Sequence, residues 1–81
     1  MKLNRIKAVL DKKGIKQTWL AEQLGKSFST VNAYACNRQQ PSLEILYKIA
    51  RILQVNVKDL LADEKEIAEK VLDIAKQKIK R

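Results

Sequence analysis

The sequence predicts an all-α fold, in which a compact five-helix domain is followed by an additional C-terminal helix. Apolar residues recur at spacings of three and four along most of the 81 residues, which is the pattern of amphipathic helices. The β-branched residues also fall at helical rather than alternating positions, so no pair of strands is expected. Glycine, serine and proline divide this pattern into short segments and so predict where each helix begins and ends.

The first two helices are expected to close at the only two glycines of the chain. Ile6 and Leu10 stand at helical spacing before Gly14, and glycine commonly ends a helix in the left-handed conformation. A second helix is expected from about residue 17 to residue 24, with Gly25 directly after it.

The third helix is expected to run from about Phe28 to Cys36. Ser27 precedes it and is a favourable N-cap residue. Asn37 follows it, and asparagine tolerates the left-handed conformation better than most residues with a side chain. A basic loop then leads to Pro41, which cannot continue a helix.

Two further helices complete the expected domain, residues 1–62. Ser42 can cap a fourth helix over residues 43–53, which carries a clear apolar stripe. After a short break, residues 57–61 form a short fifth helix.

Residues 63–81 are expected to form a separate amphipathic helix that serves dimerisation or packs on its own domain. Its acidic residues come early and its basic residues late, which suits the helix dipole. One apolar stripe holds Ile67, Val71 and Ile74, extended by Lys78, and a second holds Ala68, Leu72, Ala75 and Ile79. No proline or glycine separates this segment from the fifth helix, so the two helices can be nearly continuous. A solvated, frayed helix is the simpler alternative.

The charge of the chain is strongly basic and uneven. Lys and Arg number 17 against 9 Asp and Glu, for a net charge of +8, and residues 1–41 carry +6 of it. An uneven basic charge is typical of a phosphate-binding face, although solubility alone explains it equally well.

Several function classes find no support in the composition. The chain has no histidine to activate a serine or threonine, and its two glycines cannot build a phosphate loop. The one thiol, Cys36, can form neither an internal disulfide nor a zinc site and is expected to be a small packed side chain. We therefore expect no enzyme activity, no cofactor and no small-molecule substrate. A cytoplasmic location is expected, because there is no signal peptide or membrane span.

Residues 17–36 suggest the partner. Two short helices joined by a turn with glycine form a helix-turn-helix, which lays its second helix in the major groove of double-stranded DNA. The chain resembles the phage repressor and Cro type of helix-turn-helix regulators, the xenobiotic-response-element family, over residues 3–61. The matching residues are Gly14-Ile15-Lys16-Gln17, Leu20-Ala21, Leu24-Gly25, Ser27, Ser29-Thr30-Val31, Asn37, Pro41-Ser42-Leu43 and Ile49-Ala50 to Val55.

The resemblance implies a five-helix, repressor-like DNA-binding domain that binds a two-fold operator as a dimer. It implies that Gln17 contacts a phosphate and braces the recognition helix. It also puts a group of residues on or near the groove-facing surface, namely Lys26, Ser27, Phe28, Ser29, Asn32 and Ala33. The chain departs from the family at Lys16, where a serine or threonine cap is common, and at Asn37, where glycine is common. Leu10 and Ala35 replace an Arg–Glu pair, which leaves no stranded charge.

Phosphate contacts hold such a protein in register, and base contacts read the sequence. The expected phosphate-binding residues are Lys16, Gln17, Lys26, Ser27, Arg38 and Gln39, and the expected base-reading residues are Phe28, Ser29, Asn32 and Ala33. Asparagine can pair with adenine, serine adapts to several bases, and a large apolar side chain can meet thymine methyls. Phe28 can instead fold back on the second helix or on a partner. Trp19 is expected to pack on the first helix, with a phosphate contact as the alternative.

Together these observations predict a sequence-specific, double-stranded DNA-binding transcriptional regulator. It would act as a homodimeric repressor or autoregulator that reads a two-fold operator through residues 28–36. The alternative is a protein-interaction module, such as an antitoxin-like adaptor, in which Phe28 and the Ile67, Val71 and Ile74 stripe bind another protein.

Overall fold

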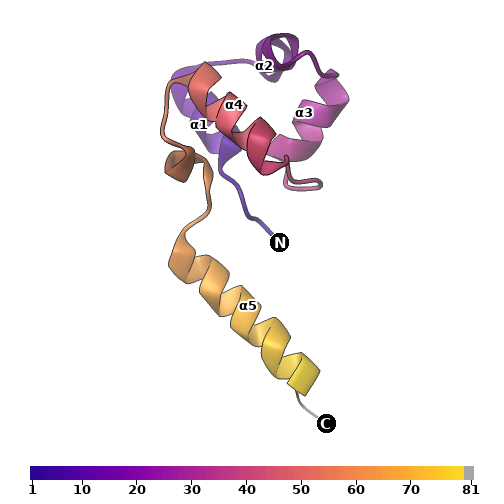
Figure 1. The fold of residues 1–81 in the computed structure, drawn as a ribbon, viewed down its shortest axis with the longest axis vertical. Helices are drawn as coiled ribbons and strands as arrows, with labels where there is room; N and C mark the ends of the chain where they lie inside the picture. The colour runs from indigo at the N-terminus through magenta and orange to yellow at the C-terminus, as the bar shows by residue number, and fades with distance from the viewer. Residues whose placement is uncertain (80–81) are drawn as a thin grey trace.

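The computed structural model describes the backbone of residues 1–79 and the side chains of residues 1–65 and 67–75. Its elements in chain order are α1 (Ile6–Lys13), α2 (Gln17–Leu24), α3 (Phe28–Ala35), α4 (Leu43–Leu53), the 3-10 helix η1 (Val57–Leu60) and α5 (Glu64–Ile79) (Figure 1). Within residues 1–79 the only β-type pairing is an isolated antiparallel bridge between Asn4 and Leu61. The predicted all-α fold is therefore confirmed. None of the helices described has the length and apolarity to cross a membrane.

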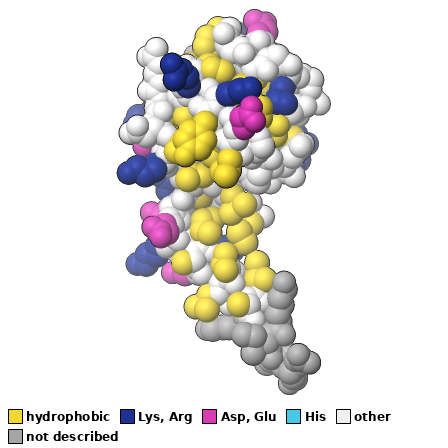
Figure 2. Space-filling model, in the orientation of Figure 1, with side chains coloured by type: hydrophobic (Ala, Val, Ile, Leu, Met, Phe, Trp, Pro, Cys, Tyr) yellow, Lys and Arg dark blue, Asp and Glu magenta, His cyan; other side chains and the backbone are white. Residues whose placement is uncertain are grey.

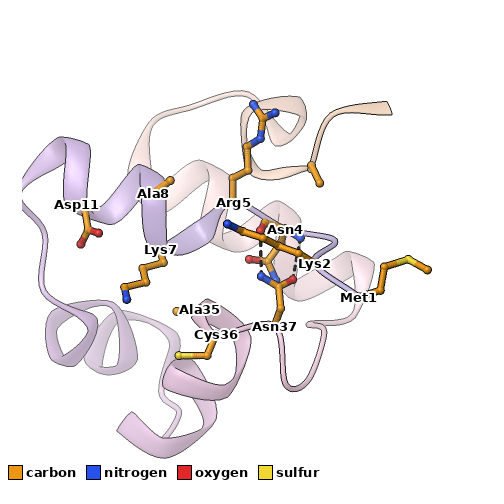
Figure 3. A pocket seen from close by; sticks show the side chains of 11 residues that line it. Met1, Lys2, Asn4, Arg5, Lys7, Ala8, Asp11, Ala35, Cys36 and Asn37 are labelled. Carbon is orange, nitrogen blue, oxygen red and sulfur yellow. Dashed lines mark hydrogen bonds between the residues drawn. The ribbon is translucent and has the colours of Figure 1, made fainter. Parts of the chain in front are cut away.

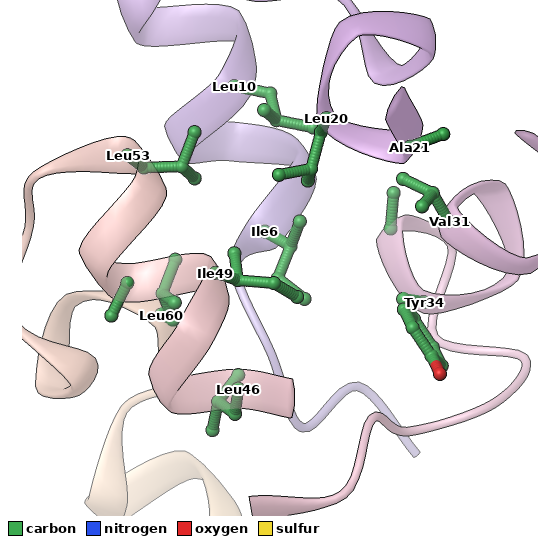
Figure 4. Close-up of a cluster of buried hydrophobic side chains, with 12 residues drawn as sticks. Ile6, Leu10, Leu20, Ala21, Val31, Tyr34, Leu46, Ile49, Leu53 and Leu60 are labelled. Carbon is green, nitrogen blue, oxygen red and sulfur yellow. The ribbon is translucent and has the colours of Figure 1, made fainter. Parts of the chain in front are cut away.

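The elements from α1 to η1 share one apolar core (Figure 4). Its fully buried side chains are Ile6, Leu10, Leu20, Val31, Ile49 and Leu60, so each of the five elements contributes at least one. Each such side chain stabilises the fold by roughly 1.5–3 kcal/mol relative to an exposed position. The helix α2 packs against both α3 and α4, and α1 packs against α3 and η1. This packing holds α2 and α3 in a fixed relation to each other.

Local signals set the ends of the helices as the sequence predicts. Gly14 and Gly25 have φ of 68° and 66° and end α1 and α2. The Ser27 hydroxyl accepts a hydrogen bond from the Thr30 amide (3.1 Å), and Ser42 caps α4 in the same way. Asn37 has the expected left-handed conformation, with φ of 59°.

The junction before α5 differs from the expected continuity. The short fifth element is a 3-10 helix that ends at Leu60, and Leu61 is extended, with φ of −100° and ψ of 145°. The N-terminal segment causes this break, because Leu61 bridges to Asn4 and the Ala62 amide donates to the Leu3 carbonyl (2.9 Å). Extended pairing at residues 61–62 prevents η1 from running into α5. As a result α5 projects away from the globule formed by α1 to η1 (Figure 1).

Candidate nucleic-acid interface

The helix α3 presents its first turn outward. Val31, Tyr34 and Ala35 lie on one side of the helix and are buried in the core. Phe28 and Ser29, in the first turn, are exposed, and half of the Phe28 side chain (51%) is open to solvent. The Ser27 cap satisfies the Thr30 amide without covering this turn. The first turn of α3 is therefore available to a groove or another surface.

A chain of hydrogen bonds crosses from the start of α2 to the loop after α3. The Asn32 Nδ2 donates to Gln17 Oε1 (2.9 Å), and the Arg38 Nη2 donates to Asn32 Oδ1 (2.6 Å). We call this the Gln17–Asn32–Arg38 chain. Because Asn32 donates at one end of its amide and accepts at the other, it fixes Gln17 and Arg38 relative to α3. An arginine has five N–H donors, so this bond leaves others for a phosphate.

These contacts bear on the predicted roles of Asn32 and Gln17. Reading an adenine requires both the oxygen and the nitrogen of an asparagine amide, and both are bonded to protein here. Beyond these two bonds the Asn32 amide keeps one N–H donor and one oxygen lone pair, so it can pair with a base while it holds Gln17 and Arg38. Base reading by Asn32 stays a prediction, and its bond to Gln17 is the bracing of α3 that the resemblance implies.

The loop that carries Arg38 is held by a polar network that the sequence reasoning missed. Asn4 is only 2% exposed, and its Nδ2 donates to the Tyr34 carbonyl (2.9 Å) and to Gln40 Oε1 (2.8 Å). Asn37 Oδ1 accepts from the amides of Leu3 and Asn4, both at 2.9 Å. Figure 3 shows Asn4 and Asn37 facing each other beneath the N-terminal segment. The one available signal was the left-handed Asn37, which indicated a tight turn but not its partner 33 residues away.

The other predicted contact residues lie at the edges of the same surface. Lys16 is exposed and directly precedes α2, where its side chain makes no capping hydrogen bond. Lys26 is half-buried in the turn between α2 and α3, and Ala33 is half-buried on α3. Gln39 is exposed, and its backbone amide donates to the Ala33 carbonyl (3.3 Å). Its backbone therefore lies at the end of α3. The structure thus brings the start of α2, the turn and the loop together around α3.

Two further side chains, Cys36 and Trp19, bear on the expectations. Cys36 is exposed, so its expected packing is wrong; it follows Ala35, the last core position of α3, and already caps the helix. Trp19 is 42% exposed and lines a shallow groove with Gly14, Ile15 and Lys16. Packing of Trp19 on α1 and its contact with a phosphate both stay predictions.

Comparison with known proteins agrees with this geometry. The family model described as helix-turn-helix matches residues 6–60. An uncharacterised HTH-type transcriptional regulator from Archaeoglobus fulgidus is 34% identical over 67 residues, which cover 82% of this chain and 94% of the relative. The crystal structure of a proposed DNA-binding protein from Bacteroides fragilis matches with a TM-score of 0.74 and 47% identity, over 76% of this chain and 100% of that one. The chain therefore belongs to the xenobiotic-response-element type of helix-turn-helix family, the family of DNA-binding transcriptional regulators that its sequence resembles.

Proposed function

We propose that the protein is a homodimer that reads a two-fold symmetric operator in double-stranded DNA, with α3 of each copy in a major groove. The observation that carries this proposal is the Gln17–Asn32–Arg38 chain beside the exposed first turn of α3. A groove-binding helix needs a free face and fixed flanking groups, because phosphate contacts set its register. Both requirements are met around α3.

The exposed first turn of α3 supplies the base-reading candidates. The Ser29 hydroxyl can adapt to several bases, and the Phe28 ring is large enough to cover a thymine methyl. Ala33 offers only a methyl contact, which leaves Asn32 as the one of these side chains whose amide can pair with a base edge through two hydrogen bonds. Few bidentate donors are therefore available, so we expect DNA shape to supply part of the selectivity.

The remaining site residues supply the anchoring. We assign to phosphates the residues that surround α3: Lys16 and Gln17 at the start of α2, Lys26 and Ser27 before α3, and Arg38 and Gln39 after it. Residues 1–41, which contain all of them, carry +6 of the net charge of +8. Such a charge favours association with DNA through the release of counterions, and it makes the affinity depend on salt.

We further propose that the protein represses transcription, its own or that of a neighbouring gene. A protein that occupies an operator overlapping a promoter blocks transcription without catalysis, a cofactor or a small-molecule substrate. The exposed thiol of Cys36 is compatible with a reducing compartment, so we place this activity in the cytoplasm.

Selection from a random duplex library, combined with a mass measurement of the bound complex, tests this function. The expected result is an enriched pair of two-fold related half-sites about 10 bp apart, bound by two chains. Equal binding to all duplexes would contradict sequence-specific reading. A single enriched half-site bound by one chain would contradict the dimer but not the reading.

A further inference from the structure

The helix α5 carries an apolar face with no partner in the described part of the chain. Val71, Leu72 and Ile74 are 52%, 55% and 44% exposed, and among the described residues no extensive contact joins α5 to α1, α2, α3 or α4. Figure 2 shows apolar side chains gathered along this projecting segment. Most of the stability of a helix in a protein comes from packing of its amphipathic face, so a 16-residue helix with this face open to water is weakly stabilised. This face therefore needs a cover.

The same apolar surface continues onto the globule. A groove of about 720 Å³ lies at the foot of α5, and its apolar lining comes from Leu3, Leu61, Ala62 and Ile67. Ile67 belongs to both the groove and the apolar face of α5. A second helix laid along α5 would thus have its end close to this groove.

The charges on α5 indicate what that second helix is. Glu64, Val71 and Lys78 follow one another at intervals of seven residues, so by helical spacing they share one stripe. The Lys78 side chain lies outside the described residues, and its place follows from the sequence alone. Residues 64–73 carry a net charge of −2 and residues 74–81 a net charge of +4. Val71 lies midway between Glu64 and Lys78, and about it residues 64–70 carry a net charge of −1 and residues 72–78 a net charge of +1.

We propose that α5 pairs antiparallel with α5 of a second copy of the chain, and that the two helices cross at Val71. This arrangement sets Glu64 of each copy against Lys78 of the other and covers both apolar faces at once. A parallel pair would instead place Glu64 beside Glu64 and the basic end beside the basic end. Like charges at such positions oppose pairing. The proposal rests on the homodimer proposed above and specifies its interface.

Disulfide trapping tests the direction of the pair. Two variants in a Cys36→Ser background, one with Glu64→Cys and one with Lys78→Cys, are mixed and mildly oxidised without DNA. A disulfide requires Cα atoms within about 7 Å. In the antiparallel pair position 64 of one copy lies opposite position 78 of the other. The two copies of position 64 are therefore fourteen residues apart along the helix axis, which is about 21 Å at about 1.5 Å per residue. We therefore expect a disulfide between the two variants and none within Glu64→Cys alone.

A charge exchange tests the same pair without cysteines. Glu64→Lys should raise the dimer Kd by about tenfold, because it creates two like-charge contacts. Adding Lys78→Glu should restore the dimer, since it re-forms both pairs in reverse. A parallel dimer has like charges at both positions in all three proteins, so neither change should alter its Kd much. Glu69→Lys makes the same charge change away from the apolar stripe and serves as the control.

Three results would overturn the proposal. A disulfide within Glu64→Cys alone would indicate a parallel pair. A monomer by sedimentation whose α5 amides resist hydrogen exchange would mean that α5 packs on its own domain. A monomer whose α5 amides exchange freely would mean that a different protein, and not a second copy of the chain, covers the apolar face of α5. DNA selection is a separate measurement. A disulfide between positions 64 and 78 with no enriched operator would contradict the proposed function but would still support the antiparallel helix pair.

Discussion

Arg38 Nη2 lies 2.6 Å from Asn32 Oδ1, so a residue of the loop after α3 is bonded to the middle of that helix. Asn32 in turn donates to Gln17 at the start of α2. A proposed base reader therefore connects two proposed phosphate ligands, and the two kinds of contact are physically coupled.

This coupling predicts that the effects of Asn32→Ala and Arg38→Ala on DNA affinity are not additive. Each single change should weaken binding to the selected duplex by about tenfold, and the double variant should be little worse than Arg38→Ala, because contacting residues share their interaction energy. Anisotropy titrations on the selected and a scrambled duplex measure this. Asn32→Ala should also narrow the gap between the two duplexes, whereas Arg38→Ala should weaken both alike. Fully additive losses would mean that the bond does not persist on DNA.

The salt dependence of binding should report the Arg38 contact separately. Removing one phosphate ligand lowers the slope of log affinity against log salt by about one. Arg38→Ala should show this change in titrations at several salt concentrations. Arg51→Ala is the matched control, because Arg51 is an exposed arginine in the last turn of α4. An equal change of slope in both variants would indicate a nonspecific charge effect.

Phe28 should recognise a thymine methyl in the selected operator. Replacing the contacted thymine by uracil removes only that methyl, and wild-type affinity should fall by about fourfold, the equivalent of one buried methyl group. Phe28→Ala should bind the thymine and uracil duplexes equally. If the wild-type protein also makes no distinction at any thymine, the ring does not read the groove.

The caps Ser27 and Ser42 form a matched pair. Each hydroxyl accepts a hydrogen bond from a backbone amide three residues later, so Ser27→Ala and Ser42→Ala should each cost about 1 kcal/mol of unfolding free energy. Chemical denaturation measures both. Only Ser27→Ala should also weaken DNA binding, because Ser27 is the one proposed to contact a phosphate. Equal binding by the two variants would remove Ser27 from the interface.

Asn4 should matter for stability and for the loop together. Asn4→Ala should lower the unfolding free energy by about 3 kcal/mol, because it strips partners from a buried polar network. Asn4→Asp retains an acceptor for the Ile6 amide but loses both donor bonds. Because this network positions the loop that carries Arg38, Asn4→Asp should weaken binding to all duplexes alike. Denaturation and anisotropy on the same samples separate the two effects.

The sequence predicted those features that have local causes. The bounds of α2 and α4 agree with expectation, because caps and left-handed residues act within a few positions of a helix end. The Asn4 network and the break at Leu61 were missed, since both depend on pairing with the N-terminal segment from 30 or more residues away. The bond between Arg38 and Asn32 was missed for a different reason: helical spacing indicates which face a side chain occupies, but not which neighbours it bonds.

Three residues near the N-terminus connect the end of α3 with the segment between η1 and α5. Asn4 holds the end of α3 through the Tyr34 carbonyl, and the Leu3 carbonyl holds Ala62 at the foot of α5. The backbone amide of Arg5 also donates to the carbonyl of Leu60, at the end of η1 (2.8 Å). A short deletion or a bulky fusion at this terminus would therefore loosen both the loop after α3, which carries Arg38, and the attachment of α5 to the rest of the fold.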